Sequence, residues 1–119
     1  MKKSTQKVPK LEMPRVKFYI LDVNGNPWPE PDLLTWAMWY EHANIVVEQT
    51  EVEPGVVVST IFLGLDYSMT GRGEVWETMV FGGKLDHAQT RCSGSREQAE
   101  AMHADMVAKV KEAEHGRKT

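Results

Sequence analysis

Three strand-like runs follow one another between residues 44 and 83, and they restrict the fold more than any other feature. The runs are NIVVEQTEVE (44–53), VVVSTIFLGLD (56–66) and EVWETMVFGG (74–83). Only the short segments PG and YSMTGRG separate them. Such connections favour an antiparallel meander, because a parallel pair needs a crossover of a dozen or more residues. The middle run is the most apolar, and we expect it to be a central strand covered on both faces, at least in part.

Two further segments have the pattern of helices. Residues 31–43, PDLLTWAMWYEHA, begin with a proline and an acid, which suit a first helical turn. Residues 95–115 begin with Ser95 and Gln98 at capping-box spacing and end before Gly116. Apolar residues recur at helical spacing in both segments. The first is apolar on more than one side, so we expect it to be covered on several sides or to contact a partner.

The N-terminal region adds one more strand. VKFYILDV (16–23) is rich in β-branched and aromatic residues, and the Asn24-Gly25 pair after it is a strong turn signal. Trp28 lies between two prolines, where it either begins a short return strand or caps the core. Residues 82–92 are expected to be irregular or to hold a short edge strand. The resulting order is β-α-β-β-β-α, an α+β fold with two helices packed on an antiparallel sheet of three to four strands.

Length and charge set the domain organisation. A chain of 119 residues is expected to form one domain, here residues 16–115, with a flexible basic tail at 1–15 and a frayed end at 116–119. The net charge of −3 gives no overall attraction to nucleic acid or membranes. Only the four lysines among the first ten residues favour a weak nucleic-acid contact. No apolar run approaches the roughly 20 residues that span a bilayer.

Glu77 interrupts the alternation of the third strand-like run. It falls on the same side as Val75, Met79 and Phe81, which is the side expected to be apolar. Together with Asp66 it could form a carboxylate pair for acid–base chemistry or for a hard cation such as Mg²⁺.

A regular hairpin would place Glu77 opposite Leu63, so Asp66 and Glu77 would meet only through a change of register or twist. The alternative is that Glu77 lies at the rim or pairs with a basic residue, with Arg72, Lys84 and Arg91 as the candidates. This structural interpretation is favoured, because buried lone carboxylates are costly.

His103 and Cys92 are the remaining candidates for chemistry. His103 borders the apolar stripe of the last helix, where it is either a base or a half-buried core residue with a hydrogen bond. Cys92 precedes a helix N-terminus and follows Arg91, features that lower a thiol pKa, but a semi-buried structural thiol is the simpler interpretation. No histidine or cysteine spacing matches a zinc site, and no glycine motif matches a phosphate-binding loop. The sequence therefore predicts no metal and no cofactor.

Four tryptophans are many for so short a chain. Tryptophan is favoured both in cores and at binding hot spots. Trp28, Trp36 and Trp39 are the candidate interface residues, for a protein partner or for self-association.

The motifs VVVSTIFLGLD, WETMVFGG and RCSGSREQAEAMHADMV together resemble a family of small, functionally uncharacterised proteins of tailed phages and prophages. The turn NGNPWPEP and the tryptophan-containing helix LLTWAMWYEHAN are similar to that family as well, so the resemblance spans about residues 16 to 110. It implies a phage or prophage origin and a site of action in the bacterial host cytoplasm, but no known activity. The chain departs from the family at Tyr67, where a histidine is common, and at GSREQ, where a tryptophan and two acids often open the last helix.

Three functions follow as hypotheses. The first is a non-enzymatic phage protein that acts through protein–protein contacts, on a host factor, on a defence system or within phage assembly. The second is a small metal-dependent or acid–base enzyme that uses Asp66, Glu77 and His103. The third, a nucleic-acid module that uses the basic tail, is disfavoured by the acidic body.

Overall fold

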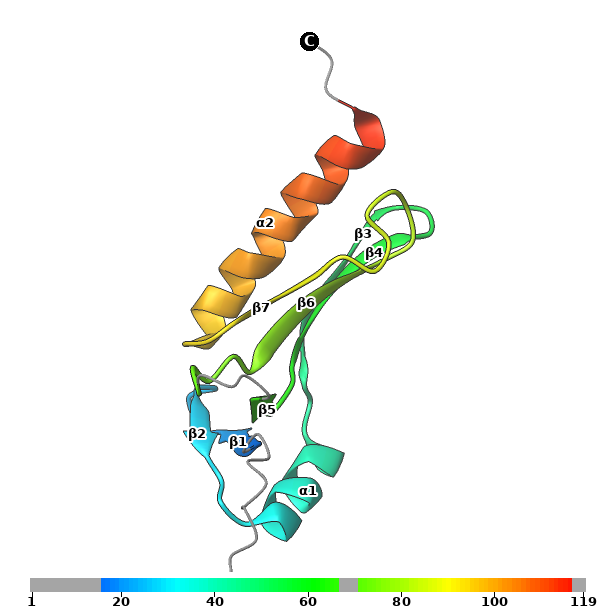
Figure 1. Cartoon of the computed structure of the whole chain (residues 1–119). Coiled ribbons are helices and arrows are strands. Elements are labelled where there is room, and N and C mark those ends of the chain that lie inside the picture. Colours follow the sequence, from blue (N-terminus) through cyan, green and yellow to red (C-terminus); the bar gives the residue numbers. More distant parts are fainter. Residues whose placement is uncertain (1–15, 67–70, 117–119) are drawn as a thin grey trace, which may run out of the picture.

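A four-stranded antiparallel sheet forms the long arm of the molecule (Figure 1). The computed structural model describes residues 16–66 and 71–116. The strands are β3 (Val46–Glu53), β4 (Val56–Phe62), β6 (Trp76–Phe81) and β7 (Gln89–Cys92), in the order β3-β4-β6-β7. Each strand pairs with the next strand of this sheet along the chain, which confirms the predicted meander, and only the two-residue strand β5 between β4 and β6 belongs elsewhere.

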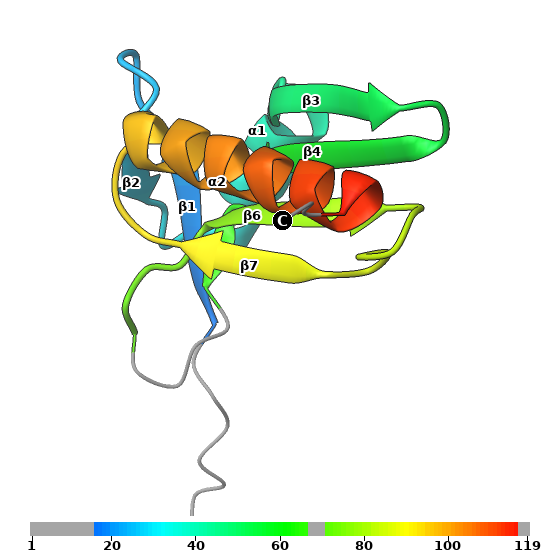
Figure 2. The same ribbon diagram turned by 90° about the horizontal axis from the view of Figure 1, so that it is seen from above.

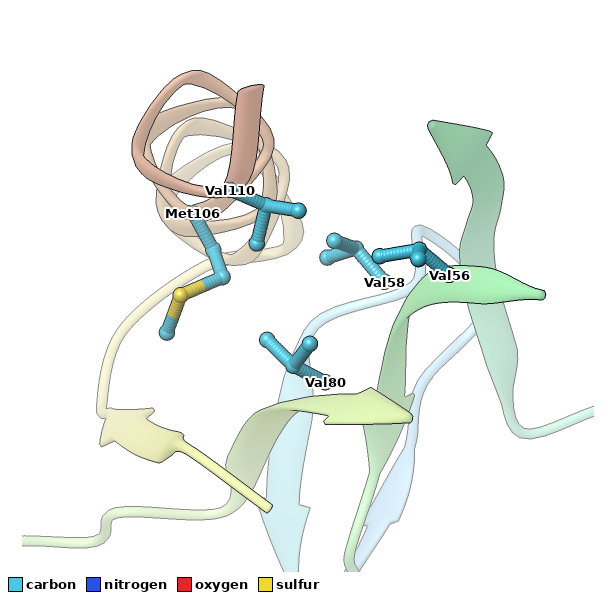
Figure 3. Close-up of a cluster of buried hydrophobic side chains, with 5 residues drawn as sticks. All are labelled: Val56, Val58, Val80, Met106 and Val110. Atoms are coloured by element: carbon cyan, nitrogen blue, oxygen red, sulfur yellow. The ribbon is translucent and has the colours of Figure 1, made fainter. Parts of the chain in front are cut away.

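Helix α2 (Arg96–His115) lies over one face of this sheet, as Figure 2 shows. Alternate residues of β4 and β6 point toward it, and the apolar ones are buried. Figure 3 shows the centre of this contact, where two helical side chains meet three valines of the sheet: Val56, Val58, Val80, Met106 and Val110. This cluster is the first part of the core.

The opposite face of the sheet has no covering helix or strand among residues 16–66 and 71–116, so the prediction that residues 56–66 are covered on both faces, at least in part, holds only to the extent that Val57 and Ile61 are half-buried there. This open face carries apolar and polar side chains from all four strands: Val46, Gln49, Glu51, Val57, Ser59, Ile61, Glu77, Met79, Phe81, Gln89 and Arg91. Phe81 and Val46 are 48% and 39% exposed. The apolar density of the middle run thus reflects one buried face and one half-buried face.

A second, smaller sheet lies at the end of the arm. It consists of β2 (Pro27–Pro29), β1 (Lys17–Leu21) and β5 (Leu65–Asp66), in that order. Trp28 thus belongs to a short return strand that pairs with β1. Helix α1 (Leu33–His42) packs mainly on β1 and reaches the four-stranded sheet only at its end, where Trp39 and Tyr40 contact Phe62. The α+β class is confirmed, but the strands form two sheets and each helix packs on its own sheet.

Gly64 explains why one predicted strand became two. It has a φ of +74°, and a Cβ there would meet the rings of Tyr40 and Trp36 at 3.0–3.2 Å. The backbone therefore turns at this residue and approaches α1 closely, which only glycine permits without strain. The chain stays in β4 up to Phe62, and the two residues after Gly64 join the second sheet.

A second core cluster joins the two sheets. Its buried members are Phe62, Val75, Trp76 and Ala99. The Phe62 ring lies 4.9 Å from that of Trp76 and 5.9 Å, edge-on, from that of Trp39 in α1. Tyr19 and Leu21 of β1 pack against the same cluster.

The helix ends follow the predicted signals. Asp32 accepts a hydrogen bond from the Thr35 backbone N–H at 2.9 Å, and the Ser95 N–H donates to the Gln98 side chain at 2.8 Å. Both contacts satisfy backbone groups that a helix N-terminus leaves free.

Neither helix of the described segments has the length and apolar character needed to cross a membrane. The predicted basic tail (1–15), Tyr67 and residues 117–119 lie outside the described residues.

Candidate functional site

Glu77 lies on the open face and is paired with Arg91. The Arg91 Nε donates to the Glu77 carboxylate at 3.0 Å, and the two residues are direct cross-strand neighbours on β6 and β7. The Glu77 side chain is 11% exposed and that of Arg91 is 36% exposed. Glu77 stands opposite Ile61 and not opposite Leu63. This shift of two residues leaves Glu77 on the same side of the sheet.

The side of β6 that holds Glu77 is not the main core side, so that part of the prediction is wrong. The buried residues that face α2 are Trp76, Thr78 and Val80, whereas Met79 is half-buried and Phe81 is exposed on the open face. Thr78 gives the core side a polar residue, and this made the two sides look alike in sequence. The Glu77 carboxylate is largely buried, and the hydrogen bond from Arg91 supplies the opposite charge that such a carboxylate requires.

Asp66 is held elsewhere in the fold. It is 2% exposed in β5, and its carboxylate accepts a hydrogen bond from the Gly73 backbone N–H at 2.7 Å. This contact anchors the chain where it returns toward β6. Asp66 thus belongs to the smaller sheet, while Glu77 belongs to the larger one.

His103 lies at the centre of the contact between α2 and the sheet, where it is 2% exposed. Its Nε2 is 2.8 Å from the Thr50 hydroxyl and its Nδ1 is 2.7 Å from the Thr60 hydroxyl. Thr60 in turn contacts the Thr78 hydroxyl. A neutral imidazole has one donor and one acceptor, so both ring nitrogens are satisfied by these two threonines. His103 and Glu77 therefore lie on opposite faces of the sheet.

Burial lowers the pKa of His103 below its ordinary value of 6.5, and the Glu48 carboxylate, 3.9 Å from Nε2, opposes part of this effect. The folded protein therefore keeps this imidazole neutral at a pH where the unfolded chain binds a proton. Stability is fully present above pH 6.5 and is lost as the pH falls through that value toward the folded pKa.

We expect the urea midpoint of unfolding to be lower at pH 5.5 than at pH 7.5. NMR titration of the His103 ring protons in the folded protein checks the cause, because these signals are expected to shift below pH 6.5. The variant His103→Gln is expected to flatten the pH dependence. A midpoint that rises on acidification contradicts the assignment.

Cys92 fits the favoured interpretation of a semi-buried structural thiol and not the alternative of an activated nucleophile. Burial raises the pKa of the Cys92 thiol, and the nearby Glu74 carboxylate raises it further. The side chain is half-buried and packs against the second core cluster. A thiol held in its protonated form is a poor nucleophile, so the structural interpretation of Cys92 fits the geometry.

Two of the three candidate interface tryptophans are half-buried and take part in packing. The Trp36 indole donates to the Tyr19 carbonyl at 3.0 Å and stacks on Tyr40, and Trp39 packs edge-on against Phe62. Trp28 is 62% exposed.

Sequence reasoning did not single out the most exposed apolar side chains of α1. Leu33, Leu34 and Met38 are 57%, 69% and 60% exposed, and we call them the α1 strip. Leu34 and Met38 are one helical turn apart and so lie side by side on the helix, whereas Leu33 precedes Leu34 at the start of the helix. No residue of α1 is buried. The signal for this strip was the all-round apolar character of the helix.

The shallow clefts on the surface are not lined by the candidate catalytic residues. A cleft of about 480 Å³ is lined by Tyr19, Asn26, Arg72 and the segment Ser93–Ser95, among others. Another of about 410 Å³ lies beside β1 and the prolines that follow it. Neither cleft is lined by Asp66, Glu77 or His103. Within the two described segments, no three histidine, cysteine, aspartate or glutamate side chains are placed to hold a metal ion.

Comparison with known protein families, with curated proteins and with solved structures finds no significant match for this chain.

Proposed function

We propose that this chain is a non-enzymatic protein that acts through protein–protein contacts, with the α1 strip as its contact surface. One observation carries the proposal: a ten-residue helix exposes more than half of each of three large aliphatic side chains. Exposed apolar side chains that form a continuous surface are typical of binding sites, whereas isolated ones are ordinary. Burying each of them against a partner would contribute about 1.5–3 kcal/mol.

The enzymatic alternative has less support. Asp66, Glu77 and His103 lie in three separate environments: the smaller sheet, the open face and the interface between α2 and the sheet. Acid–base or metal chemistry needs side chains that converge on one reacting atom. Each of the three is instead engaged with a neighbour in the fold.

The motifs FLGLD and ETMVFGG resemble a phage and prophage family, and this resemblance supports a proposal about where the protein acts. A protein of this origin would act in the cytoplasm of a bacterial host, on a host factor, a defence system or another phage protein. Because the α1 strip is apolar, we expect its partner to offer an apolar groove or face.

The double variant Leu34→Ser/Met38→Ser tests the proposal. Tagged chains are produced in bacterial cells, cross-linked and purified, and the attached protein is quantified by mass spectrometry. We expect the double variant to lose at least about tenfold of the cross-linked partner, because each lost apolar contact weakens binding by about that factor.

Val23→Ser is the matched control, because Val23 is fully exposed in a turn outside α1. It is expected to keep the partner, and all variants are expected to keep the thermal unfolding midpoint. Undiminished cross-linking of the double variant, or no partner for the native chain, contradicts the proposal.

A further inference from the structure

The fold leaves two apolar surfaces unpartnered, and they are of complementary kinds. One is a helix surface, the α1 strip, and the other is a sheet surface, the open face. A sheet face is stabilised when another layer of secondary structure packs on it. The opposite face of the same sheet shows that a single helix, α2, is enough to cover all four strands.

The dimensions of α1 match the open face. Ten helical residues extend about 15 Å, and the outer strands of a four-stranded sheet lie about 14 Å apart. A helix of this length laid across the strands would contact Val57, Ile61, Met79 and Phe81 on the two central strands.

The charges of the open face are compatible with an apolar helix. Glu77 and Arg91 are already hydrogen-bonded to each other, and Gln49 donates to the Ser59 hydroxyl at 3.1 Å. Covering the two central strands would therefore bury no unpaired charge, which is the main cost of burying ionised groups. Glu51, which is exposed opposite Val57 on the outer strand β3, has to stay at the rim of such a contact.

The area favours a second copy of this chain over a partner that takes only one surface. One helix-on-sheet contact, about 15 Å long and about 10–12 Å wide, covers about 150–180 Å² on each side. Stable complexes bury about 800 Å² per partner. A second copy offers an α1 strip for this open face and an open face for this α1 strip. The contact is then made twice, which brings the area into the range of a weak, reversible dimer.

The position of α1 allows such an exchange. Figure 1 shows α1 beyond the end of the four-stranded sheet, on the side away from α2. Helix α1 and the open face therefore both belong to the half of the molecule that α2 leaves uncovered.

We propose that two copies of this chain form a twofold dimer in which the α1 strip of each copy packs on the open face of the other. This inference rests on the proposed function, since it names the partner of the α1 strip. The interface is isologous: both copies use the same combined surface, and the symmetry is closed.

Sedimentation velocity of the full chain from 5 to 500 µM tests the dimer. The native chain is expected to change from monomer to dimer over this range. Leu34→Asp in the α1 strip and Phe81→Asp on the open face are each expected to raise the dissociation constant at least tenfold. Val23→Asp, which adds the same charge at a fully exposed residue outside both surfaces, is expected to leave it unchanged.

A mixture of the two defective variants gives the decisive result. In a mixed dimer, the native α1 strip of the Phe81→Asp copy meets the native open face of the Leu34→Asp copy. One of the two contacts is then intact, whereas each homodimer has both contacts damaged. We therefore expect the equimolar mixture to associate more tightly than either variant alone.

Each other outcome overturns the dimer. If only Phe81→Asp weakens association, two sheets stack on each other, and if only Leu34→Asp does, two α1 helices pair. A monomer up to 500 µM overturns self-association altogether. That result leaves the proposed function standing if cross-linking in cells still depends on Leu34 and Met38, so the two failures are distinguishable.

Discussion

Replacing Phe62 by alanine is expected to lower the free energy of unfolding by about 3–5 kcal/mol, the range for a fully buried phenylalanine. Its ring is fully buried between Trp39 of α1 and Trp76 of β6. Two effects add up: the variant loses the free energy gained by burying the ring, and the substitution leaves a cavity. Three separate elements would have to move together to fill that cavity. Urea unfolding followed by tryptophan fluorescence measures the effect.

Phe81→Ala is the matched control, because Phe81 carries the same ring on the open face and is 48% exposed. Its cost is expected to be about 1 kcal/mol at protein concentrations too low for dimer formation. Equal losses for the two variants would contradict the division of the sheet into a buried face and an open face.

Replacing Gly82 by alanine is expected to lower the free energy of unfolding by about 2–5 kcal/mol. Gly82 has a φ of +88°, where a side chain costs about 1–2 kcal/mol. In addition, a Cβ at this residue would collide with the carbonyl oxygen of Gly55 in the turn between β3 and β4. Backbone atoms of a tight turn do not move aside easily, so overpacking adds about 1–3 kcal/mol.

Gly55→Ala separates the two contributions. Gly55 has a similar φ of +84°, but a Cβ there meets nothing within 4 Å. Its cost is expected to be only the conformational part, about 1–2 kcal/mol. If both variants lose the same stability in urea unfolding, the close approach between Gly82 and Gly55 contributes nothing.

The meander was predictable because its signals are local. The PG pair at 54–55 and the short connection before residue 74 join the three strand-like runs closely. Each run therefore has the next one as its nearest possible partner. The last helix was predictable for the same reason, since Ser95 and Gln98 mark its start within four residues. Patterns of this kind depend on sequence neighbours, and no distant contact changed them.

The features that could not be predicted depend on contacts between distant residues. The backbone turn at Gly64 follows from the rings of Trp36 and Tyr40, which are more than twenty residues away. The face of Glu77 depends on where α2 packs, because Thr78 and Glu77 interrupt both alternations of β6 equally. Exposure of Leu34 and Met38 follows from the small size of the second sheet, which α1 contacts with only one side.

The two sheets also differ in how far apart their paired residues lie in the chain. This difference affects the order in which the two sheets form during folding. Neighbouring strands of the meander are joined by short connections, whereas β1 reaches β5 by pairing Lys17 with Asp66. Closing a longer loop costs more entropy and slows the pairing of its ends. We therefore infer that the meander orders first and that the smaller sheet with α1 docks onto it later. During synthesis, β1 leaves the ribosome early but has to wait for residue 66 before its pairing with β5 can begin.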